Sequence, residues 1–488
     1  MTADATAPPP NARWDRSFFG HPRGLSVLFF TEMWERFSFY GLRALLILFM
    51  TATAARGGLA FPVLKAGAIY GLYTSSIYLL SLPGGWIADR ITGHRRAVLI
   101  GGIVIALGHF TMAVPTLGTF YAGLVIIALG TGLLKPNIST MVGALYTKND
   151  TRRDAGFSMF YMGINLGALI APLICGYLGE NINWHYGFGA AGVGMTLGVI
   201  QYSLGGKYLG HAGIASSGTK SDRRLLGWVI AGLVALVALA AFLDISVAAI
   251  SDAFGLILAS IVVAFFVWLL TAKGYTAIER RRFWAILILF IAACAFWSAF
   301  EQAGSTLNLF AEKNTNLHAW DFPLWGLFRA SYFQAVNSVF IVVLAPVFAW
   351  LWLRLRRHEP SSTAKFSFGL VFVGLGFAIL IPVATSTSAS PWWLVLTYLL
   401  HTAGELCLSP VGLSATTKLA PARIAGLMMG LFFTSISVGD YVGGRIASLY
   451  ESFPLPKIFG VVAGFCIVCG LLLVFLLRPM KKLMGEIN

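Results

Sequence analysis

Charged side chains are scarce in this 488-residue chain: Asp, Glu, Lys and Arg together make up 11% of it, against about a quarter of an ordinary soluble domain. Hydrophobic residues make up 57%, and the mean hydropathy is +0.77. This composition excludes a water-soluble protein. Apolar stretches of about 20 residues recur along the chain, each long enough to cross a bilayer core about 30 Å thick. We therefore expect a membrane protein that spans the bilayer many times.

The short alternating segments of a transmembrane β-barrel are missing, since whole windows are apolar and rich in Gly, Ala, Leu and Phe. The chain is therefore predicted to be all-α.

Cysteine is also rare. All five cysteines fall inside apolar segments, which favours no disulfide framework and no zinc site: they are Cys175, Cys294, Cys407, Cys466 and Cys469. We interpret the CxxC of Cys466 and Cys469 as helix packing rather than redox chemistry.

A cleavable signal peptide is not expected, because the first 20 residues are polar and Pro-rich and the first apolar run follows Arg23. The N-terminus is predicted to stay in the cytoplasm. Breaks at Gly, Pro and charge clusters predict fourteen spans: 24–53, 66–89, 97–114, 119–146, 154–178, 186–205, 225–243, 253–272, 283–311, 329–353, 366–384, 391–418, 423–450 and 456–478.

The basic residues support this topology. Most of the 35 Lys and Arg residues lie in alternate loops and in the two termini, which the positive-inside rule assigns to the cytoplasm. The net charge of +15 is thereby explained without a nucleic-acid partner. We expect a multi-pass protein of the cytoplasmic (inner) membrane with both termini in the cytoplasm.

The predicted organisation has two six-helix halves. The limits are a cytoplasmic tail at 1–23, an N-terminal bundle at 24–205, a linker with a two-helix insertion at 206–282, a C-terminal bundle at 283–478 and a tail at 479–488. The insertion is expected to face lipid, because its apolar runs hold no charge and Asp244 and Asp252 are predicted to lie in the turn between its helices.

Charges inside the spans are the strongest functional signal, since each costs about 2.5 to 3.5 kcal/mol at the centre of a membrane helix. The first span contains Glu32, Glu35 and Arg36 on one helical face, with Arg43 two turns further on. Two carboxylates beside one guanidinium can take up and release a proton, because like charges cannot both ionise cheaply in a low dielectric. A structural ion-pair network is the alternative interpretation.

Three further charged residues lie inside other spans, and Lys135 stands alone in its span. Lys135 must find a partner on another helix or bind a substrate anion. Glu301 and Glu405 lie in the second half of the chain, opposite the basic residues of the first half. If the halves face one cavity, cross-cavity ion pairs that form and break would make a gate.

Polar aromatic and amide side chains surround these charges in the sequence, and each is a candidate for binding or for packing: Tyr40, Tyr78, Tyr161, Asn165, Trp297, Asn337 and Ser409. His401 and Glu405 are four residues apart, but a third metal ligand is missing, so no metal site is expected. The charges of GGWIADRITGHRR are predicted to form a clasp between helices at the cytoplasmic surface.

The motifs around these residues resemble those of one family. TEMWERFSFYG is similar to the ExxERFxYYG signature of the proton-dependent oligopeptide transporters, the POT or PTR2 family of the major facilitator superfamily. GLLKPNIS, FSMFYMGINLGALIAP, FWSAFEQAGSTLNLF and GELCLSPVGLS follow in the family's order, so the similarity runs from Glu32 to about Gly444. It implies two six-helix bundles with inverted repeats, a two-helix insertion of the bacterial type, and alternating access around a midplane site.

The resemblance also implies roles for individual residues. Glu32, Glu35 and Arg36 would belong to a proton-coupling cluster, Arg43 and Glu301 would form a coupling ion pair, and Lys135 and Glu405 a gating pair. The peptide carboxylate would lie toward Arg36, Arg43 and Lys135, and its ammonium toward Asn165, Asn337 and Glu405. The pocket would be lined by Tyr40, Tyr78, Tyr161, Trp297, Ser409 and Phe432.

The sequence departs from the family pattern at several positions. Phe39 replaces a tyrosine, and Ser338 replaces a proline, which predicts a straighter helix there. Phe432 stands where tryptophan is usual and should enlarge a subsite. Asp440 stands where asparagine is usual, and its expected partner is Arg445.

The resulting hypothesis is a monomeric proton-coupled symporter that imports di- and tripeptides, with protons and the lipid bilayer as its other partners and with no cofactor or metal. A POT-like carrier of another anion or zwitterion, such as nitrate, an amino-acid conjugate or a peptidomimetic, is the alternative within transport. A membrane enzyme would need a carboxylate or histidine cluster at one interface, which is not evident. A channel or receptor would lack obligatory proton flux.

Overall fold

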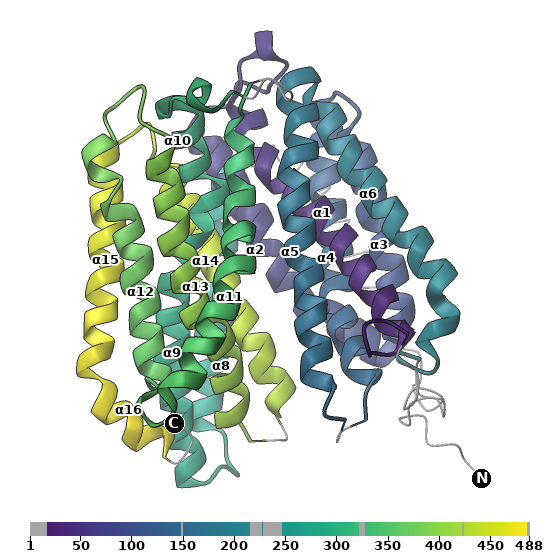
Figure 1. The fold of residues 1–488 in the computed structure, drawn as a ribbon, viewed down its shortest axis with the longest axis vertical. Coiled ribbons are helices and arrows are strands. Elements are labelled where there is room, and N and C mark those ends of the chain that lie inside the picture. The colour runs from purple at the N-terminus through teal and green to yellow at the C-terminus, as the bar shows by residue number, and fades with distance from the viewer. Residues whose placement is uncertain are drawn as a thin grey trace. The chain divides into compact units, whose positions relative to one another are not determined.

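The structure is a computed structural model, and it describes residues 17–147, 150–214, 227, 246–321, 327–421 and 424–485. Across these ranges every named element is a helix, and the only β-type pairings are two isolated bridges, Phe18–His21 and Thr315–Ala389. The predicted all-α fold is confirmed. Figure 1 shows the helices as long, mostly parallel or antiparallel rods within each part of the chain.

The long helices of the first half of the chain are α1 (Arg23–Thr51), α2 (Val63–Ile87), α3 (His94–Met112), α4 (Leu117–Ala144), α5 (Arg153–Tyr177) and α6 (Trp184–Gly205). The second half holds α8 (Val247–Thr271), α9 (Ala277–Phe300), α10 (Thr306–Asn314), α11 (Phe333–Leu355), α12 (Ser362–Ala378), α13 (Trp392–Leu419), α14 (Ala425–Ala447), α15 (Leu455–Phe475) and α16 (Leu477–Met484). Short 3-10 or π-helical turns extend several of these helices.

Nine helical stretches within the described residues are long and apolar enough to cross a membrane. Apart from residue 227, the predicted span 225–243 lies outside the described residues. Span 283–311 covers parts of two helices, α9 and α10, and each of the other predicted spans covers one long helix. Helix α1 is long enough to cross a membrane but is not among these nine, because it contains four charged residues: Glu32, Glu35, Arg36 and Arg43. The same charges make it the best candidate for a functional helix.

The chain divides into two compact units. Unit 1 comprises residues up to Leu45 together with Ser76–Ser246, and unit 2 comprises Leu46–Ser75 together with Val247–Asn488. The division passes through α1 and α2, so the last part of α1 and the first part of α2 belong to unit 2. The predicted domain limits stay predictions.

Unit 1 is held together by close helix crossings at small residues. Helix α3 packs along α4 and α6. A Cβ added to Gly101 of α3 would lie 2.7 Å from the carbonyl oxygen of Gly130 on α4. Because lipid provides no hydrophobic drive between helices, such close packing is a main source of their association.

In unit 2, α9 is the central helix. The apolar window of the stretch that contains α9 is 72% buried, whereas the windows of α8 and α11 are only 17% and 11% buried. Helices α8 and α11 are therefore mostly exposed, and the contact of α8 with lipid stays a prediction. Interhelical hydrogen bonds add to the packing, for example from Ser367 Oγ of α12 to the carbonyl oxygen of Gly470 on α15, at 2.7 Å.

The first part of α2 packs on α14 within unit 2. A Cβ added to Gly71 would lie 2.9 Å from the Cα of Gly444. The hydroxyls of Ser75 and Ser437 lie 2.8 Å apart, and each also donates to the backbone carbonyl of the other residue. Within the same unit, Arg56 of the 3-10 turn Ala54–Arg56 forms an ion pair of 2.6 Å with Glu312 of α10.

Two sequence expectations need correction. Span 283–311 was predicted as one helix, but α9 ends at Phe300, a 3-10 turn covers Glu301–Gly304, and α10 begins at Thr306. Asp252 was expected in a turn, yet it lies in the second turn of α8.

Candidate functional site

The charged cluster of unit 1 lies on α1. Arg36 Nε is 3.2 Å from Glu32 Oε1 and also donates to Glu35 Oε2. All three side chains are buried, with relative exposures of 3% for Glu32, 0% for Glu35 and 3% for Arg36. The predicted spacing therefore brings these groups into contact on one side of the helix.

The acids outnumber the base in this cluster. Glu32 Oε2, Glu35 Oε1 and Arg36 Nη2 make no hydrogen bond to any residue that the structure describes. One guanidinium compensates only one of two ionised carboxylates, and an uncompensated buried charge costs several kcal/mol. A proton on one carboxylate removes that cost, so the arrangement suits reversible protonation.

Helix α5 fixes the position of the cluster. A Cβ added to Gly167 of α5 would lie 2.2 Å from the carbonyl oxygen of Met33 and 3.0 Å from Cβ of Arg36. The absent side chain allows α5 to touch α1 beside the charges. Two residues earlier, Asn165 is 4% exposed and donates to the carbonyl oxygen of Tyr161 at 3.0 Å, while Tyr161 itself is 42% exposed.

Two cations of unit 1 lie over tyrosine rings. The Lys135 ammonium of α4 is 3.4 Å from the ring centre of Tyr78 on α2, and the Arg43 guanidinium is 5.6 Å from that of Tyr40. Lys135 also acts electrostatically on Glu32, and Tyr40 and Tyr78 act on Arg36. Unit 1 thus gathers its predicted charged residues and two of its tyrosines around one region.

In unit 2, Glu301 lies at the point where α9 is interrupted. It is 9% exposed and begins the 3-10 turn Glu301–Gly304. The carbonyl oxygen of Ala303, left without a regular helical partner, accepts from Gln334 Nε2 of α11 and lies 3.5 Å from the Tyr398 hydroxyl of α13. Interrupted helices occur at membrane depth where neighbouring side chains satisfy the freed backbone groups.

Glu405 is held by an amide within unit 2. Asn337 Nδ2 of α11 donates to Glu405 Oε2 at 3.1 Å and to Thr402 Oγ1 at 2.9 Å. Ser409 lies one turn further along α13 and is half-buried. The structure therefore brings Asn337 and Glu405 together, as expected if both contact one ligand group.

His401 does not join this polar group. Its ring packs between Phe300 and Phe377, with centroid distances of 6.2 and 5.2 Å, and it is 1% exposed. Among the described residues, no group of three or more His, Cys, Asp or Glu side chains could hold a metal ion.

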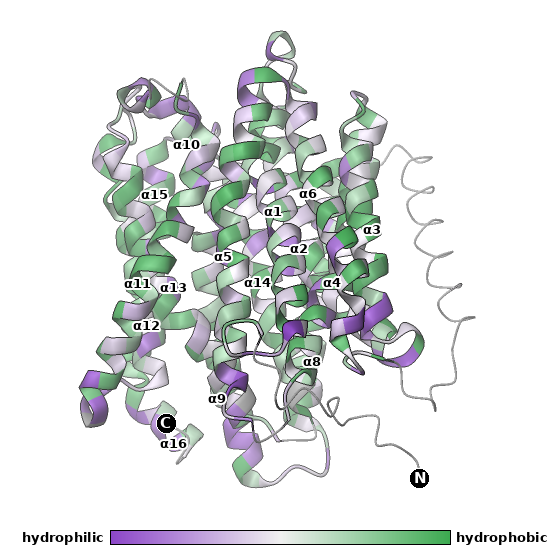
Figure 2. Ribbon diagram, turned by 45° about the vertical axis from the view of Figure 1, so that its right-hand side comes forward, coloured by the Kyte–Doolittle hydropathy of each residue, from purple (hydrophilic) through white to green (hydrophobic). Residues whose placement is uncertain are grey.

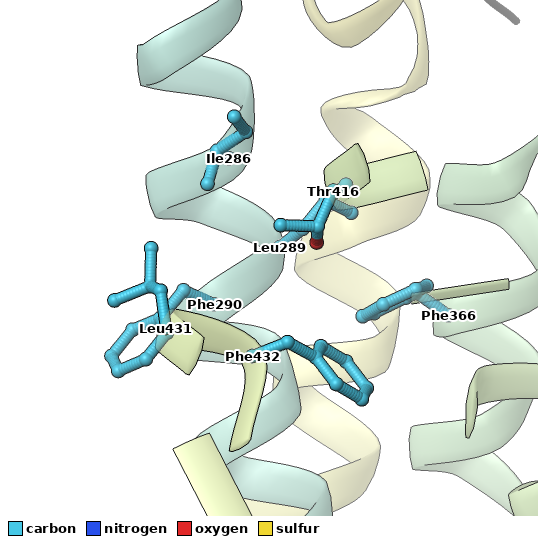
Figure 3. Close-up of a pocket in the computed structure, with 7 residues that line it drawn as sticks. All are labelled: Ile286, Leu289, Phe290, Phe366, Thr416, Leu431 and Phe432. Carbon is cyan, nitrogen blue, oxygen red and sulfur yellow. The ribbon is translucent and has the colours of Figure 1, made fainter. Parts of the chain in front are cut away.

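The aromatic candidates of unit 2 are buried in its packing. Trp297 is 5% exposed, and its Cβ would lie 2.3 Å from a Cβ added to Gly439 of α14. Phe432 lines a small cavity with Ile286, Leu289, Phe290, Phe366, Thr416 and Leu431 (Figure 3). The cavity has room for little more than one water molecule. Phe432 thus packs inside unit 2, and its contact with substrate stays a prediction.

The expected partner of Arg445 was wrong. Arg445 Nη1 lies 2.8 Å from Asp252 Oδ1, so the ion pair joins α14 to α8 rather than to Asp440 of its own helix. Asp440 is 2% exposed. The predicted pairs Arg43–Glu301 and Lys135–Glu405 each join residues of the two different units and stay predictions.

Sequence reasoning missed three residues that hold the site in unit 2. Gln334 and Tyr398 support the interruption of α9, and Thr402 shares the Asn337 amide with Glu405. Gln334 lies in the segment FQAVNS, three residues before Asn337, so its position in the motif was a usable signal. Tyr398 and Thr402 precede Glu405 by seven and three residues, but such spacings are too common to indicate a role.

The comparisons with known proteins agree with one another. A sequence model described as the POT family matches residues 95–462. An uncharacterized transporter, YclF, of Bacillus subtilis is 43% identical, with 96% of each chain covered. A di-/tripeptide transporter of Lactococcus lactis subsp. cremoris is 37% identical over 97% of this chain and 99% of that protein. The crystal structure of a peptide transporter POT in complex with sulfate matches with a TM-score of 0.91, 39% identity and 99% of each chain covered.

Proposed function

The chain belongs to the POT family of transporters and has its major facilitator fold, and from this premise we propose that it is a symporter which couples the inward movement of protons to the import of di- and tripeptides. The observation that carries the proposal is the buried cluster of Glu32, Glu35 and Arg36, because a chain retains such costly charges inside a membrane helix for a function. The family consists of transporters, and the proposed activity is not enzymatic.

The proposed proton sites are the α1 cluster and Glu301. In the cluster, two carboxylates share one guanidinium, and a proton cancels the excess negative charge. Glu301 lies at the interruption of α9, where the backbone departs from a regular helix. We propose that Glu301 pairs with Arg43 until a proton arrives, and that protonation at both places releases Arg43 and Arg36 for the substrate.

The proposed substrate is a zwitterion held at both ends. Arg36, Arg43 and Lys135 of unit 1 offer cations for the peptide carboxylate, while Asn165 is proposed to lie toward the peptide ammonium. Asn337 and Glu405 of unit 2 already form one hydrogen-bonded group that suits an ammonium. Tyr40, Tyr78, Tyr161, Trp297 and Ser409 are proposed to line the pocket.

The proposed cycle follows from these contacts. Peptide loading separates Lys135 from Glu405, and the cytoplasmic side then opens to release peptide and proton. One proton that enters down 100 mV and one pH unit releases about 2.3 plus about 1.4 kcal/mol, enough for several hundred-fold accumulation of a neutral substrate. One titratable carboxylate therefore suffices to drive the cycle.

We further propose the topology that the basic loops favour, with both termini in the cytoplasm, a location in the inner membrane, and the single chain as the working unit. A protease-sensitive tag at the C-terminus tests the orientation. We expect cleavage in inside-out vesicles and protection in right-side-out vesicles, and the reverse pattern would refute the topology.

Uptake of labelled dialanine by purified protein in liposomes tests the function. With an acidic exterior and a negative interior, we expect accumulation that disappears when an ionophore collapses both gradients. A panel of competitors containing dipeptides, tripeptides, nitrate and amino-acid conjugates distinguishes the substrate classes. Absence of dialanine uptake, together with gradient-driven uptake of labelled nitrate or a labelled conjugate, would replace the peptide by another anion or zwitterion.

A further inference from the structure

Helix α16 lies across one end of unit 2 and has two different sides. Its eight residues, Leu477–Met484, begin two positions after α15 ends at Phe475. Met480 is 0% and Met484 is 1% exposed, and the Met484 sulfur lies 3.8 Å from Thr363 Oγ1 in the first turn of α12. The basic residues Arg478, Lys481 and Lys482 are all exposed. The methionines therefore fix the helix on unit 2 with its cations pointing outward.

The first turns of α9 add further cations to this end of unit 2. Helix α16 packs against α9. At the start of α9, Glu279 caps the helix by accepting from the backbone N–H of Thr276 at 2.7 Å. Arg280 and Arg281 are exposed, and Arg280 Nη2 donates to the carbonyl oxygen of Ala272 at 3.4 Å. Figure 2 shows this end of α9 as hydrophilic, in contrast to the apolar surface along the helix. We call Arg280, Arg281, Arg478, Lys481 and Lys482 the basic edge.

Exposed apolar side chains adjoin the basic edge. Phe475, three residues before Arg478, is 79% exposed, and Trp284, three residues after Arg281, is 50% exposed. In a membrane-spanning helix, such side chains face lipid tails or the interface. On α9 about one helical turn separates Trp284 from Arg281, and Phe475 ends α15 two positions before α16 begins, which places the cations at the level of the phospholipid headgroups.

We propose that the basic edge is a binding site for the headgroups of anionic phospholipids. A soluble anion would meet the cations but gain nothing from Phe475 and Trp284, whereas a lipid uses both features. The cations come from two helices that the chain separates by almost 200 residues, so bound lipid would also tie α16 and α15 to α9. Anionic headgroups attract basic residues at the membrane surface, and several such residues act together.

Lipid retention by the purified chain tests this proposal without relying on transport. The protein is purified from mixed micelles that contain equal amounts of phosphatidylethanolamine and phosphatidylglycerol, and bound lipids are counted by native mass spectrometry. The test variant is Arg478→Gln/Lys481→Gln/Lys482→Gln. The matched control is Arg96→Gln/Arg153→Gln/Lys207→Gln, which removes three exposed cations from unit 1.

We expect the parent and the control to retain phosphatidylglycerol preferentially, and the test variant to lose at least about tenfold of that preference, since each of the three lost basic residues contributes about fivefold. Equal loss in both triple variants would overturn the site in favour of general charge attraction. A preference that survives in the test variant would also overturn it.

Two further measurements separate other outcomes. Inorganic phosphate is added at increasing concentration, and displacement of the lipid at millimolar phosphate would show an anion site rather than a lipid site.

The variant Met480→Ser/Met484→Ser detaches α16 but keeps every cation, and we expect it to lose lipid preference as well. Unchanged retention there would contradict the role of a docked α16. Peptide uptake is recorded separately, so failure of the lipid site leaves the proposed transport function untouched.

Discussion

At the scale of single residues, the surroundings of Lys135 decide what its charge can do. Its ammonium lies 3.4 Å from the ring centre of Tyr78 on a neighbouring helix and acts electrostatically on Glu32. A lysine over a ring face keeps its positive charge, and we propose that this charge binds the carboxylate of the peptide.

We therefore predict that Lys135→Ala loses uptake by at least about tenfold, since a lost interaction of 1.4 kcal/mol already has that effect. Lys135→Arg should retain part of the activity because it keeps the charge. Proteoliposome uptake and counterflow measure both. If Lys135→Ala keeps both activities at the parent level, the gate lies elsewhere.

Gln334 carries a second prediction at this scale. Its amide donates to the carbonyl oxygen of Ala303 in the interruption after α9. Gln334→Leu removes the donor and leaves that buried carbonyl with a weaker partner, at a cost of about 1 to 3 kcal/mol. We expect a lower melting temperature in detergent and impaired uptake. Glu451→Gln, which removes an exposed acid of unit 2, is the control and should match the parent.

At the scale of elements, the close contact between α5 and α1 positions the proton-binding cluster. Gly167→Ala places a methyl group 2.2 Å from the carbonyl oxygen of Met33, so one of the two helices must shift. We predict a lower melting temperature together with reduced uptake. In Gly189→Ala, on α6, the nearest atom to the new Cβ is 3.8 Å away. That control should be neutral or more stable, because alanine favours a helix over glycine by about 1 kcal/mol.

The segment that precedes α1 gives a prediction for pH. His21 Nδ1 lies 2.9 Å from the Tyr146 hydroxyl, and Arg152, which pairs with Asp150, donates to the carbonyl oxygen of Gly20. Burial and the Arg152 charge lower the pKa of His21, although Asp150 opposes them. The folded protein thus favours neutral His21. Its contribution to stability is present above the unfolded pKa of about 6.5 and is lost as the pH falls through the lower folded value.

The melting temperature of the parent should consequently fall more between pH 7.5 and pH 5 than that of His21→Gln. Differential scanning fluorimetry in detergent gives both curves. Parallel curves would mean that protonation of His21 does not strain this contact.

Sequence reasoning located most helices because their signal is length and polarity, and it located the α1 cluster because i, i+3 and i+4 spacing determines a shared face. It missed the interruption at Glu301, because the side chains that stabilise it, Gln334 and Tyr398, come from other helices. It also misplaced the partner of Arg445, since a residue on the same helix was weighed and Asp252 of α8 was assigned to a turn. A periodic sequence pattern gives no information about contacts between segments that are distant in the chain.

At the scale of the whole molecule, the account combines two sets of buried polar residues, one in each unit. Unit 1 supplies the cluster of Glu32, Glu35 and Arg36 together with the cations Arg43 and Lys135. Unit 2 supplies Glu301 at the interruption after α9 and the hydrogen-bonded pair Asn337–Glu405. We propose that peptide and proton join these sets in one cycle. Obligatory coupling is the property that separates this account from a channel or an uncoupled carrier.

Proton movement driven by peptide alone is the most direct test of that coupling. Proteoliposomes that contain a pH-sensitive dye are given a steep inward gradient of dialanine, with no imposed pH gradient and with valinomycin and potassium to hold the potential at zero. The account predicts acidification of the lumen by the parent and by Glu451→Gln, and none by Glu301→Gln, which should still exchange peptide in counterflow. Acidification by Glu301→Gln equal to that of the parent would contradict the proposed role of Glu301, and peptide entry without acidification by the parent would contradict proton coupling itself.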